Sequence, residues 1–434
     1  MMKENTAKCR LAILVIFALL CSVAIADDLY WTGGTSGDWS TAANWWNSTR
    51  NAGAGNYPNG KDDQYGHSAY FDQTLAGDKS KIVNRTVSFS RAERMRGSVY
   101  VYDGTLADPI VFSTKDDFGL SVDDFGLSVT NKDAKFKIGK SGQVGWLKLQ
   151  SGTYDMYWNL ELINGGVVVD GADISVSNSV QIGNAAAVET HYVQNGGSLI
   201  INNRLSLGMK ATSTNTFEVL KGTLTMLDTP IRFSYNAQFL LKGGVVSPTS
   251  ISIESDSDNK NVFLFDGGTL KAQKGNNTMF PASDKLALKV GASGGVFDTA
   301  GWAGITFADD FESAVDNGTD GGMKFTGGGS ASITGAIGYT GPTTVELGTV
   351  VTIADRANIF GEGKGGLRCS LPNPKPEGNE YIPVLTTTGE DDFTASDLTK
   401  CAAAEGTGAI LFKISDGGKS IMAKRSNGLI ISFH

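Results

Sequence analysis

The sequence predicts an all-β chain that winds into a parallel β-helix, and three observations support this prediction. Glycine is abundant, with 55 residues against ten prolines, and hardly any segment has the apolar period of a helix. Short segments alternate between apolar and polar residues, and similar glycine-containing corners recur between them. A β-sandwich is the main alternative, because its strands alternate too, but it does not predict a recurring corner of one type.

The first 26 residues have the features of a secretory signal peptide. Three basic residues precede an unbroken apolar run over 11–20, and alanines follow at 24 and 26. The mature protein is therefore expected to begin near Asp27. The run is too short to span a bilayer and no later segment is apolar for long enough, so we expect no transmembrane segment in the mature chain.

The charge of the mature chain argues against some partners. The whole chain has a net charge of −8, and removal of residues 1–26 leaves 34 basic and 44 acidic residues, a balance of −10. Such a balance disfavours nucleic acid and anionic membrane surfaces. We therefore expect a secreted protein that works outside the cell or at the cell surface.

Residues 27–75 are predicted to form a Trp-rich cap. Four of the seven tryptophans lie between Trp31 and Trp46. Fully exposed, four such rings would form an apolar patch of roughly 600–1,000 Å², larger than a soluble monomer usually carries. We therefore expect most of them to cover the open end of the β-helix. Neighbouring residues on a strand point in opposite directions, so one of Trp45 and Trp46 is expected to face outward. Both are therefore candidate carbohydrate contacts.

Residues 76–360 are predicted to form the β-helix. The segment 153–162 alternates, and Tyr157 on its more polar face is a third candidate carbohydrate contact. A similar alternation runs over 172–182. The side chains expected to point into the core are Tyr154, Met156, Trp158, Leu160, Leu162, Ile174, Val176, Val180 and Ile182.

The corners share an apolar strand end followed by Asn, Lys or Asp and then glycine. Glycine suits them because a sharp turn demands backbone angles that other residues reach only at a cost. The spacing of 22 to 31 residues is in the range of solenoid coils. The marker glycines are Gly166, Gly197, Gly222, Gly244, Gly268 and Gly295.

Residues 361–434 are predicted to form a C-terminal β cap with a hairpin turn at Asp416-Gly417-Gly418. Cys369 and Cys401 lie in this region. Outside the cell they are candidates for a disulfide, with two free buried thiols as the alternative. The expected strands are 381–387, 409–414, 419–424 and 428–433.

An enzyme on the same scaffold is the main functional alternative. Polygalacturonase-like sites combine paired carboxylates with Gly-His-Gly and Arg-x-Lys, and neither tripeptide occurs. The acid pairs at 62–63, 309–310 and 391–392 are expected to be solvated turn residues. Pectate lyases use an Arg base beside calcium-binding acids; Arg204 and Arg232 lie in coil-like segments without identifiable acidic partners, and the lyase alternative stays open.

No catalytic residue, cofactor or metal site is predicted. The segments 254–258 and 316–322 are weak calcium candidates. In the first, acids alternate as in a calcium loop, but the glycine and the distant Glu of an EF-hand are missing.

Two parts of the sequence carry a family resemblance. Near the N-terminus stand Trp31-Thr32-Gly33, Asp38-Trp39-Ser40, Ala43-Asn44-Trp45 and Ala69-Tyr70-Phe71, and GYTGPTTVELGTVVTIA occupies 338–354. They are similar to the opening and to the repeat of bacterial secreted proteins with autotransporter-associated β-strand repeats. The resemblance implies a right-handed β-helix passenger on or near the cell surface, and it implies no activity.

The end of the chain departs from that family. Autotransporters finish with a membrane barrel of at least eight strands, whereas about four are expected here. The sequence favours a single-stranded parallel β-helix with a structural, adhesive or ligand-displaying role, and the resemblance implies that this β-helix is right-handed. The alternatives are a polysaccharide lyase or glycoside hydrolase and a carbohydrate-binding protein. The expected partners are extracellular polysaccharide or cell-surface components, and no cofactor is expected.

Overall fold

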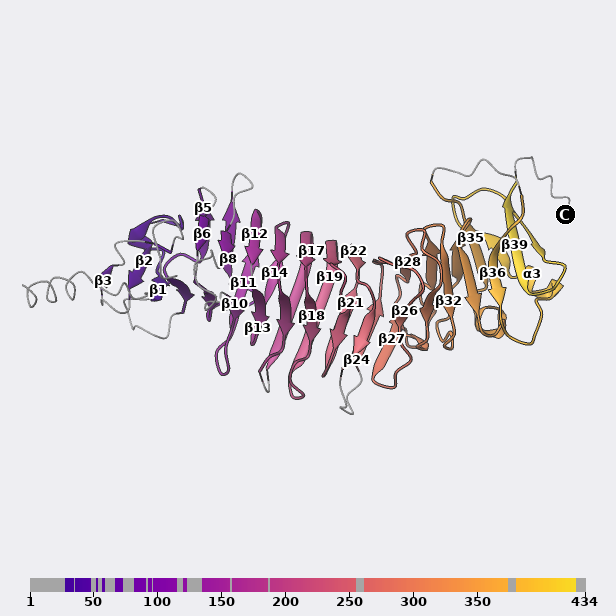
Figure 1. Cartoon of the computed structure of the whole chain (residues 1–434), viewed down its shortest axis with the longest axis horizontal. Helices are drawn as coiled ribbons and strands as arrows, with labels where there is room; N and C mark the ends of the chain where they lie inside the picture. The colour runs from indigo at the N-terminus through magenta and orange to yellow at the C-terminus, as the bar shows by residue number, and fades with distance from the viewer. Residues whose placement is uncertain are drawn as a thin grey trace, which may run out of the picture.

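The computed structural model describes most of the chain from residue 28 to residue 426. Strands account for 51% of the described residues and helices for 3%, so the prediction of an all-β chain is confirmed. The strands follow one another along an elongated body, with the first strands at one end and the last at the other (Figure 1). The described residues are 28–34, 36–47, 52–53, 57–58, 67–72, 82–90, 93–95, 97–114, 120–122, 135–156, 158–185, 188–254, 261–373 and 380–426.

The largest sheet has 21 strands that pair in parallel. β11 pairs with β14, β14 with β17, and β17 with β19, so each strand lies beside the one formed a winding earlier. We call each such winding a coil. The strands are β5 (Thr86–Phe89), β6 (Glu93–Met95), β8 (Ile110–Thr114), β9 (Leu120–Val122), β11 (Gly145–Leu149), β12 (Thr153–Met156), β14 (Gly165–Val169), β15 (Asp173–Val176), β17 (Glu189–Ile201), β19 (Thr214–Met226), β21 (Ala237–Leu241), β22 (Val245–Ser247), β24 (Asn261–Phe265), β25 (Thr269–Lys271), β27 (Leu286–Val290), β28 (Gly295–Asp298), β30 (Phe311–Ser313), β31 (Met323–Thr326), β33 (Thr343–Glu346), β35 (Leu367–Ser370) and β37 (Cys401–Ala403).

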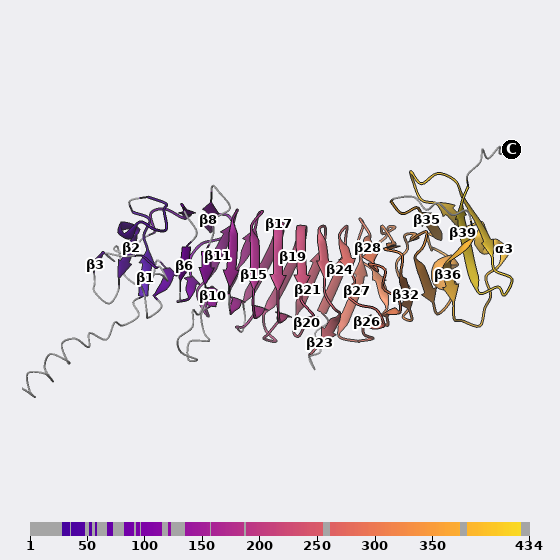
Figure 2. The ribbon, with the colours of Figure 1, turned by 45° about the horizontal axis from the view of Figure 1, so that its top comes forward.

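Two further sheets of 11 and seven strands lie one after the other along the body (Figure 2). Both are parallel except at their outer ends, where β1–β2–β3 and β36–β39–β38 pair antiparallel. The 11-stranded sheet contains β1 (Asp28–Trp31), β2 (Trp45–Asn47), β3 (Ala52–Gly53), β4 (Ser68–Phe71), β7 (Val99–Val101), β10 (Lys135–Ile138), β13 (Asn159–Leu162), β16 (Ser179–Ile182), β18 (Arg204–Leu207), β20 (Ile231–Phe233) and β23 (Ile251–Ile253). The seven-stranded sheet contains β26 (Asn277–Phe280), β29 (Ile305–Phe307), β32 (Ser330–Ile333), β34 (Val350–Ile353), β36 (Ile382–Thr387), β38 (Ile410–Ile414) and β39 (Ser420–Arg425).

Helices contribute little to the fold. Those in the described part of the chain are the 3-10 turn η1 (Ala42–Asn44) and the short helices α2 (Ala357–Phe360) and α3 (Ala395–Leu398). None of them has the length and apolar character that crossing a membrane requires.

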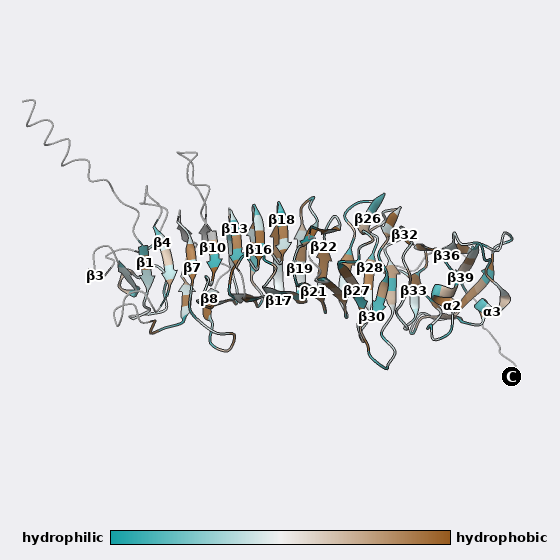
Figure 3. Cartoon of the chain, turned by 90° about the horizontal axis from the view of Figure 1, so that it is seen from below, coloured by the Kyte–Doolittle hydropathy of each residue, from teal (hydrophilic) through white to brown (hydrophobic). Residues whose placement is uncertain are grey.

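The parallel pairing is consistent with a β-helix-like solenoid. An immunoglobulin-type sandwich is built from antiparallel sheets, so the pairing argues against the sandwich alternative. Apolar and polar residues alternate along many strands (Figure 3). One face of each sheet therefore packs on a shared core.

The predicted core face is confirmed except at one residue. Tyr154 and Met156 are buried on β12, as are Leu160 and Leu162 on β13 and the four side chains predicted over 172–182. Trp158 is only half-buried. The alternating segment 153–162 is divided between two sheets, because β12 belongs to the 21-stranded sheet and β13 to the 11-stranded sheet.

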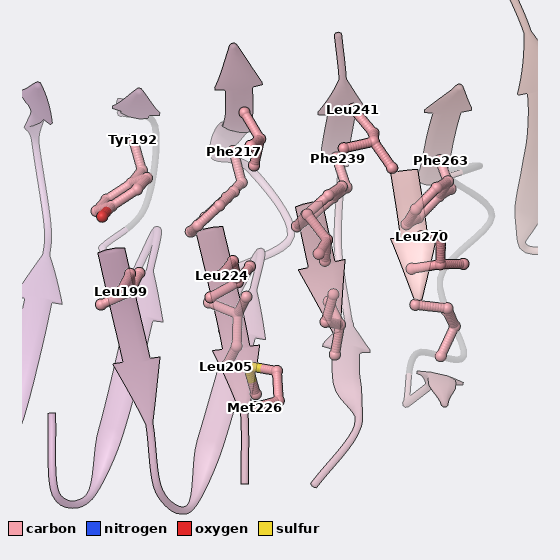
Figure 4. Packing of buried hydrophobic residues seen from close by; sticks show 14 of the residues in the cluster. Tyr192, Leu199, Leu205, Phe217, Leu224, Met226, Phe239, Leu241, Phe263 and Leu270 are labelled. Atoms are coloured by element: carbon pink, nitrogen blue, oxygen red, sulfur yellow. The ribbon is translucent and has the colours of Figure 1, made fainter. Parts of the chain in front are cut away.

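Aromatic side chains stack inside the core from coil to coil. Tyr192, Phe217, Phe239 and Phe263 share one register line on β17, β19, β21 and β24. Their ring centroids are 4.4, 5.1 and 5.1 Å apart, with the planes within 13° of parallel. Figure 4 shows these rings in succession along the body. The ladder extends the axial core through four neighbouring coils.

The corner glycines are needed for two separate reasons. Gly197, Gly222 and Gly244 have φ of 62°, 82° and 64°, a region that residues with a Cβ rarely adopt. A Cβ on Gly222 would also lie 2.3 Å from the carbonyl oxygen of Gly197 in the preceding coil. The repeated glycine thus lets the corners stack directly on one another.

The C-terminal region matches three of its four predicted strands. β36, β38 and β39 fall where strands were expected, and β38 and β39 form an antiparallel hairpin around Asp416-Gly417-Gly418. The fourth, over 428–433, lies outside the described residues. β35, β37 and α3 were not predicted.

Candidate functional site

Three of the four N-terminal tryptophans are packed together in the core. Trp45 lies edge-on to Trp31 and Trp39, with centroids 5.1 and 4.8 Å away, and Phe71 contacts all three rings. Each buried indole N–H donates to a backbone carbonyl: Trp31 to Asn84, Trp39 to Pro58 and Trp45 to Trp39. The prediction that most of these rings are buried is confirmed.

The register of β1 and β2 separates the two adjacent tryptophans. Trp45 lies opposite Trp31 and points into the core, whereas Trp46 lies opposite Tyr30 and points outward. Trp45 is 1% exposed, so the prediction that it contacts carbohydrate was wrong. Trp46 is half-buried, and it remains the candidate of the pair.

Trp46 begins an aromatic row on the outward face of the 11-stranded sheet. We define the aromatic row as Trp46 on β2, Tyr30 on β1, Tyr70 on β4 and Tyr100 on β7. Each residue lies directly opposite the next in the strand register. The successive ring centroids are 5.8, 4.9 and 4.6 Å apart. Four strands far apart in sequence thus place their rings in one line.

The orientation of the rings determines which of their atoms a ligand can contact. Tyr30, Tyr70 and Tyr100 are stacked, with interplanar angles of 21° and 19°, so their faces cover one another. Tyr30 is buried between its neighbours, while Trp46, Tyr70 and Tyr100 are half-exposed. A ligand would therefore meet ring edges and phenolic hydroxyl groups. Tyrosine combines apolar surface with a polar tip, which makes it frequent at binding surfaces.

A polar cluster adjoins the row beyond Tyr100. Tyr102 lies 5.6 Å from Tyr100 between ring centroids, and the Lys140 ammonium is 4.5 Å from the Tyr102 ring centroid. Lys140 also forms an ion pair of 3.4 Å with Asp72, whose side chain is fully buried. Gln143 donates through Nε2 to Asp72 and to the Tyr102 carbonyl. The cluster fixes the position of Tyr102 at the end of the row.

The phenols of Tyr70 in the row and of Tyr102 beside it remain protonated at neutral pH. Burial raises the pKa of Tyr70, and the neighbouring Asp28 raises it further. Burial also raises the pKa of Tyr102, with Tyr100 and Asp72 as the next contributions. The two hydroxyl groups therefore serve as hydrogen-bond donors and acceptors and are poor bases.

Sequence reasoning missed the three tyrosines, although a signal for them exists. Each stands between two inward-facing apolar residues on a short strand, in the triplets Leu29-Tyr30-Trp31, Ala69-Tyr70-Phe71 and Val99-Tyr100-Val101. The irregular spacing of the first coils hides this repeat. Tyr157, the third predicted contact, lies outside the described residues.

Cys369 and Cys401 are free thiols in the structure. The register places Cys369 opposite Ala403 and Cys401 opposite Leu367, an offset of two residues. Strand spacing and rise then put the two Cα atoms about 8 Å apart, beyond the roughly 7 Å that a disulfide spans without backbone movement. This geometry favours the alternative of two free thiols. Burial raises the pKa of each thiol to about 12.

The acids with shifted pKa values do not resemble a catalytic pair. A hydrogen bond from Lys148 lowers the pKa of Asp170. Burial opposes ionisation of Asp320, but hydrogen bonds from Thr340, Gly341 and other groups outweigh burial and lower its pKa. A general acid needs a raised pKa.

The acid pairs and the two arginines named from the sequence do not come together in a catalytic site in the described part of the chain. Asp309 is buried, so the prediction of a solvated turn residue was wrong for it. Asp310 is exposed and accepts a backbone hydrogen bond from Ala336, and Asp392 pairs with Lys419. Arg232 pairs with Glu254, and Arg204 is exposed. The acids at 62–63, 256 and 258 lie outside the described residues.

The described part of the chain contains no group of three or more His, Cys, Asp or Glu side chains that could hold a metal ion. In the weak calcium candidate 316–322, the Asp320 carboxylate is occupied by backbone N–H groups of Gly322, Thr340 and Gly341. That occupation leaves little capacity for a cation.

Compared with known proteins, the chain matches no family model, no curated protein and no solved structure. The resemblance to proteins with autotransporter-associated repeats therefore stays a prediction from sequence motifs.

Proposed function

We propose that the chain is a secreted or cell-surface protein whose outward sheet faces display binding groups to an extracellular polysaccharide or another cell-surface component. In this proposal it forms one right-handed β-helix over 76–360, with a Trp-rich cap at 27–75 and a β cap at 361–434. Residues 1–26 are the secretion signal. The buried tryptophans and the antiparallel strands at both ends support the two caps, since such strands end the parallel ladder.

The aromatic row is the observation that supports binding. It places ring edges and hydroxyl groups at the strand spacing, along the line that a linear polymer would follow over the coils. Hydroxyl-rich sugars suit such groups, because phenols donate and accept hydrogen bonds while the exposed ring edges contact apolar C–H groups.

Binding to a panel of soluble polysaccharides tests the proposal. We expect the wild-type protein to bind at least one polymer, and Tyr70→Ala with Tyr100→Ala to weaken that binding about ten-fold or more. Trp46→Ala should weaken it to a smaller extent. Tyr235→Ala is the matched control, because Tyr235 is a half-buried tyrosine outside the row. Failure of every polymer to bind, or an equal loss in the control, would reject the row as the site.

The same panel addresses the enzyme alternative. New sugar ends after incubation would indicate a lyase or hydrolase, and their absence together with row-dependent binding would favour display. Fluorescence of intact cells labelled with an antibody against the chain would test its exposure at the surface.

A further inference from the structure

A cleft lies beside β35. β35 is near the opposite end of the body from β1 and β2, which carry part of the aromatic row (Figure 1). The cleft has a volume of about 470 Å³, within the range of roughly 300–1,000 Å³ that small-molecule sites occupy. Lys324 on β31, Thr344 on β33 and Ser370 on β35 line it, together with the loops 371–373 and 404–407. Three neighbouring coils thus supply a rigid base.

The polar groups of this cleft have unused hydrogen-bonding capacity. Among the described residues, the side chains of Lys324 and Thr344 form no hydrogen bond or ion pair, and the buried Oγ of Ser370 has no partner. Folded proteins usually satisfy a buried polar group such as the Ser370 hydroxyl. Lys324 is half-buried, and Glu405, the acidic residue of the lining, is exposed and forms no ion pair with it. The cation inside the cleft therefore lacks a protein partner.

We propose that this cleft binds a single sugar unit that carries a carboxylate, of the hexuronate type. Its carboxylate pairs with Lys324, and its hydroxyl groups bond to Thr344 and to the polar side chains of the loops. Leu371 and Pro372 supply apolar surface for its C–H face. The unit is either a free monosaccharide or the end of a glycan chain.

Calorimetric titration of the full chain tests this site. Glucuronate, galacturonate and a uronate-terminated oligosaccharide are compared with glucose and galactose. We expect the uronates to bind more tightly than the neutral sugars. Lys324→Met should weaken uronate binding about ten-fold or more, and Thr344→Val about five-fold. Tighter binding of the oligosaccharide than of the free uronates would assign the site to chain ends, and equal binding would assign it to the free sugar.

Thr269→Val is the matched control, because Thr269 lies on the same outward register line as Lys324 but outside the cleft. Circular dichroism verifies that each variant is folded, and Lys324→Arg should retain most of the affinity. The proposal is overturned if no uronate binds up to about 10 mM, if neutral sugars bind equally well, or if Lys324→Met changes nothing. The cleft and the row share no residue, so either can fail alone.

Discussion

The backbone N–H of Gly341 donates to Oδ1 of Asp320 at 2.8 Å, and this bond links one coil to the next. Thr340 donates to the other carboxylate oxygen through its N–H at 2.7 Å and through its hydroxyl at 3.1 Å. Thr340 and Gly341 belong to the segment over 338–354 that resembles a repeat. The Gly-x-Thr-Gly part of that segment therefore has a structural role, which is to hold a buried carboxylate.

Asp320→Asn is expected to destabilise the fold by about 1.5–3 kcal/mol at pH 7, because it removes hydrogen bonds to a charged acceptor. The pKa of Asp320 is lowered in the folded state. Its contribution is therefore present above the unfolded pKa of about 3.9 and is lost as the pH falls through the folded value. Urea unfolding between pH 7 and pH 3 measures both effects. Asp316→Asn, at an exposed aspartate, should leave stability nearly unchanged, and an equal change in both variants would contradict this account.

Phe239→Ala is expected to cost about 3–5 kcal/mol, because it opens a cavity in the stacked aromatic ladder. Phe239 is fully buried between Phe217 and Phe263. Chemical denaturation measures the loss. The neighbouring Gln238→Ala serves as control, since Gln238 points outward and is exposed. Similar stability of the two variants would show that the register of β21 is wrong.

Gly222→Ala should destabilise the chain more than Gly348→Ala does. Both glycines have positive φ, 82° and 101°, but a Cβ at Gly348 would meet no atom within 4 Å. The control therefore isolates the cost of the backbone angle, about 1–2 kcal/mol. The difference between the two melting temperatures measures the additional cost of the clash between the Cβ at position 222 and the preceding coil. No difference would mean that the corners are not stacked as described.

Both thiols should react slowly in the native protein. Burial raises the pKa of Cys369 and Cys401 to about 12, so little thiolate is present at pH 8. Iodoacetamide labelling followed by peptide mass mapping should show weak modification of Cys369 in the native protein. Addition of urea, with no reductant present, should make the modification strong. A peptide pair joined through Cys369 and Cys401 would instead establish the disulfide.

Much of the fold could be predicted because the alternation of apolar and polar residues and the glycines at the corners are local properties of the sequence. Ile174, Val176, Val180 and Ile182 alternate and are buried, since the pleat fixes which face each one occupies. The break between β12 and β13 was missed because Met156 and Trp158 preserve the alternation through the turn. Only the position of neighbouring coils shows that the chain changes sheet there.

The candidate site was harder to predict because it depends on register between distant segments. Trp46 could be proposed from its place beside Trp45, but its contact with Tyr30 depends on an antiparallel pairing that the sequence does not specify. Tyr70 and Tyr100 join the row only through the stacking of coils of unequal length. The cleft at Lys324 likewise arises from three strands and two loops that no local pattern links.

The stacking of coils in register is the central claim, and a cross-linking experiment tests it most directly. Ser198 on β17 lies opposite Thr223 on β19, and both flank inward-facing leucines. Cysteines at Ser198 and Thr223 should form a disulfide under mild oxidation, since directly opposed Cα atoms are about 4.8 Å apart. Cysteines at Ser198 and Thr225, offset by two residues, should form little. Equal yields, or no cross-link between Ser198→Cys and Thr223→Cys, would contradict the parallel stacking.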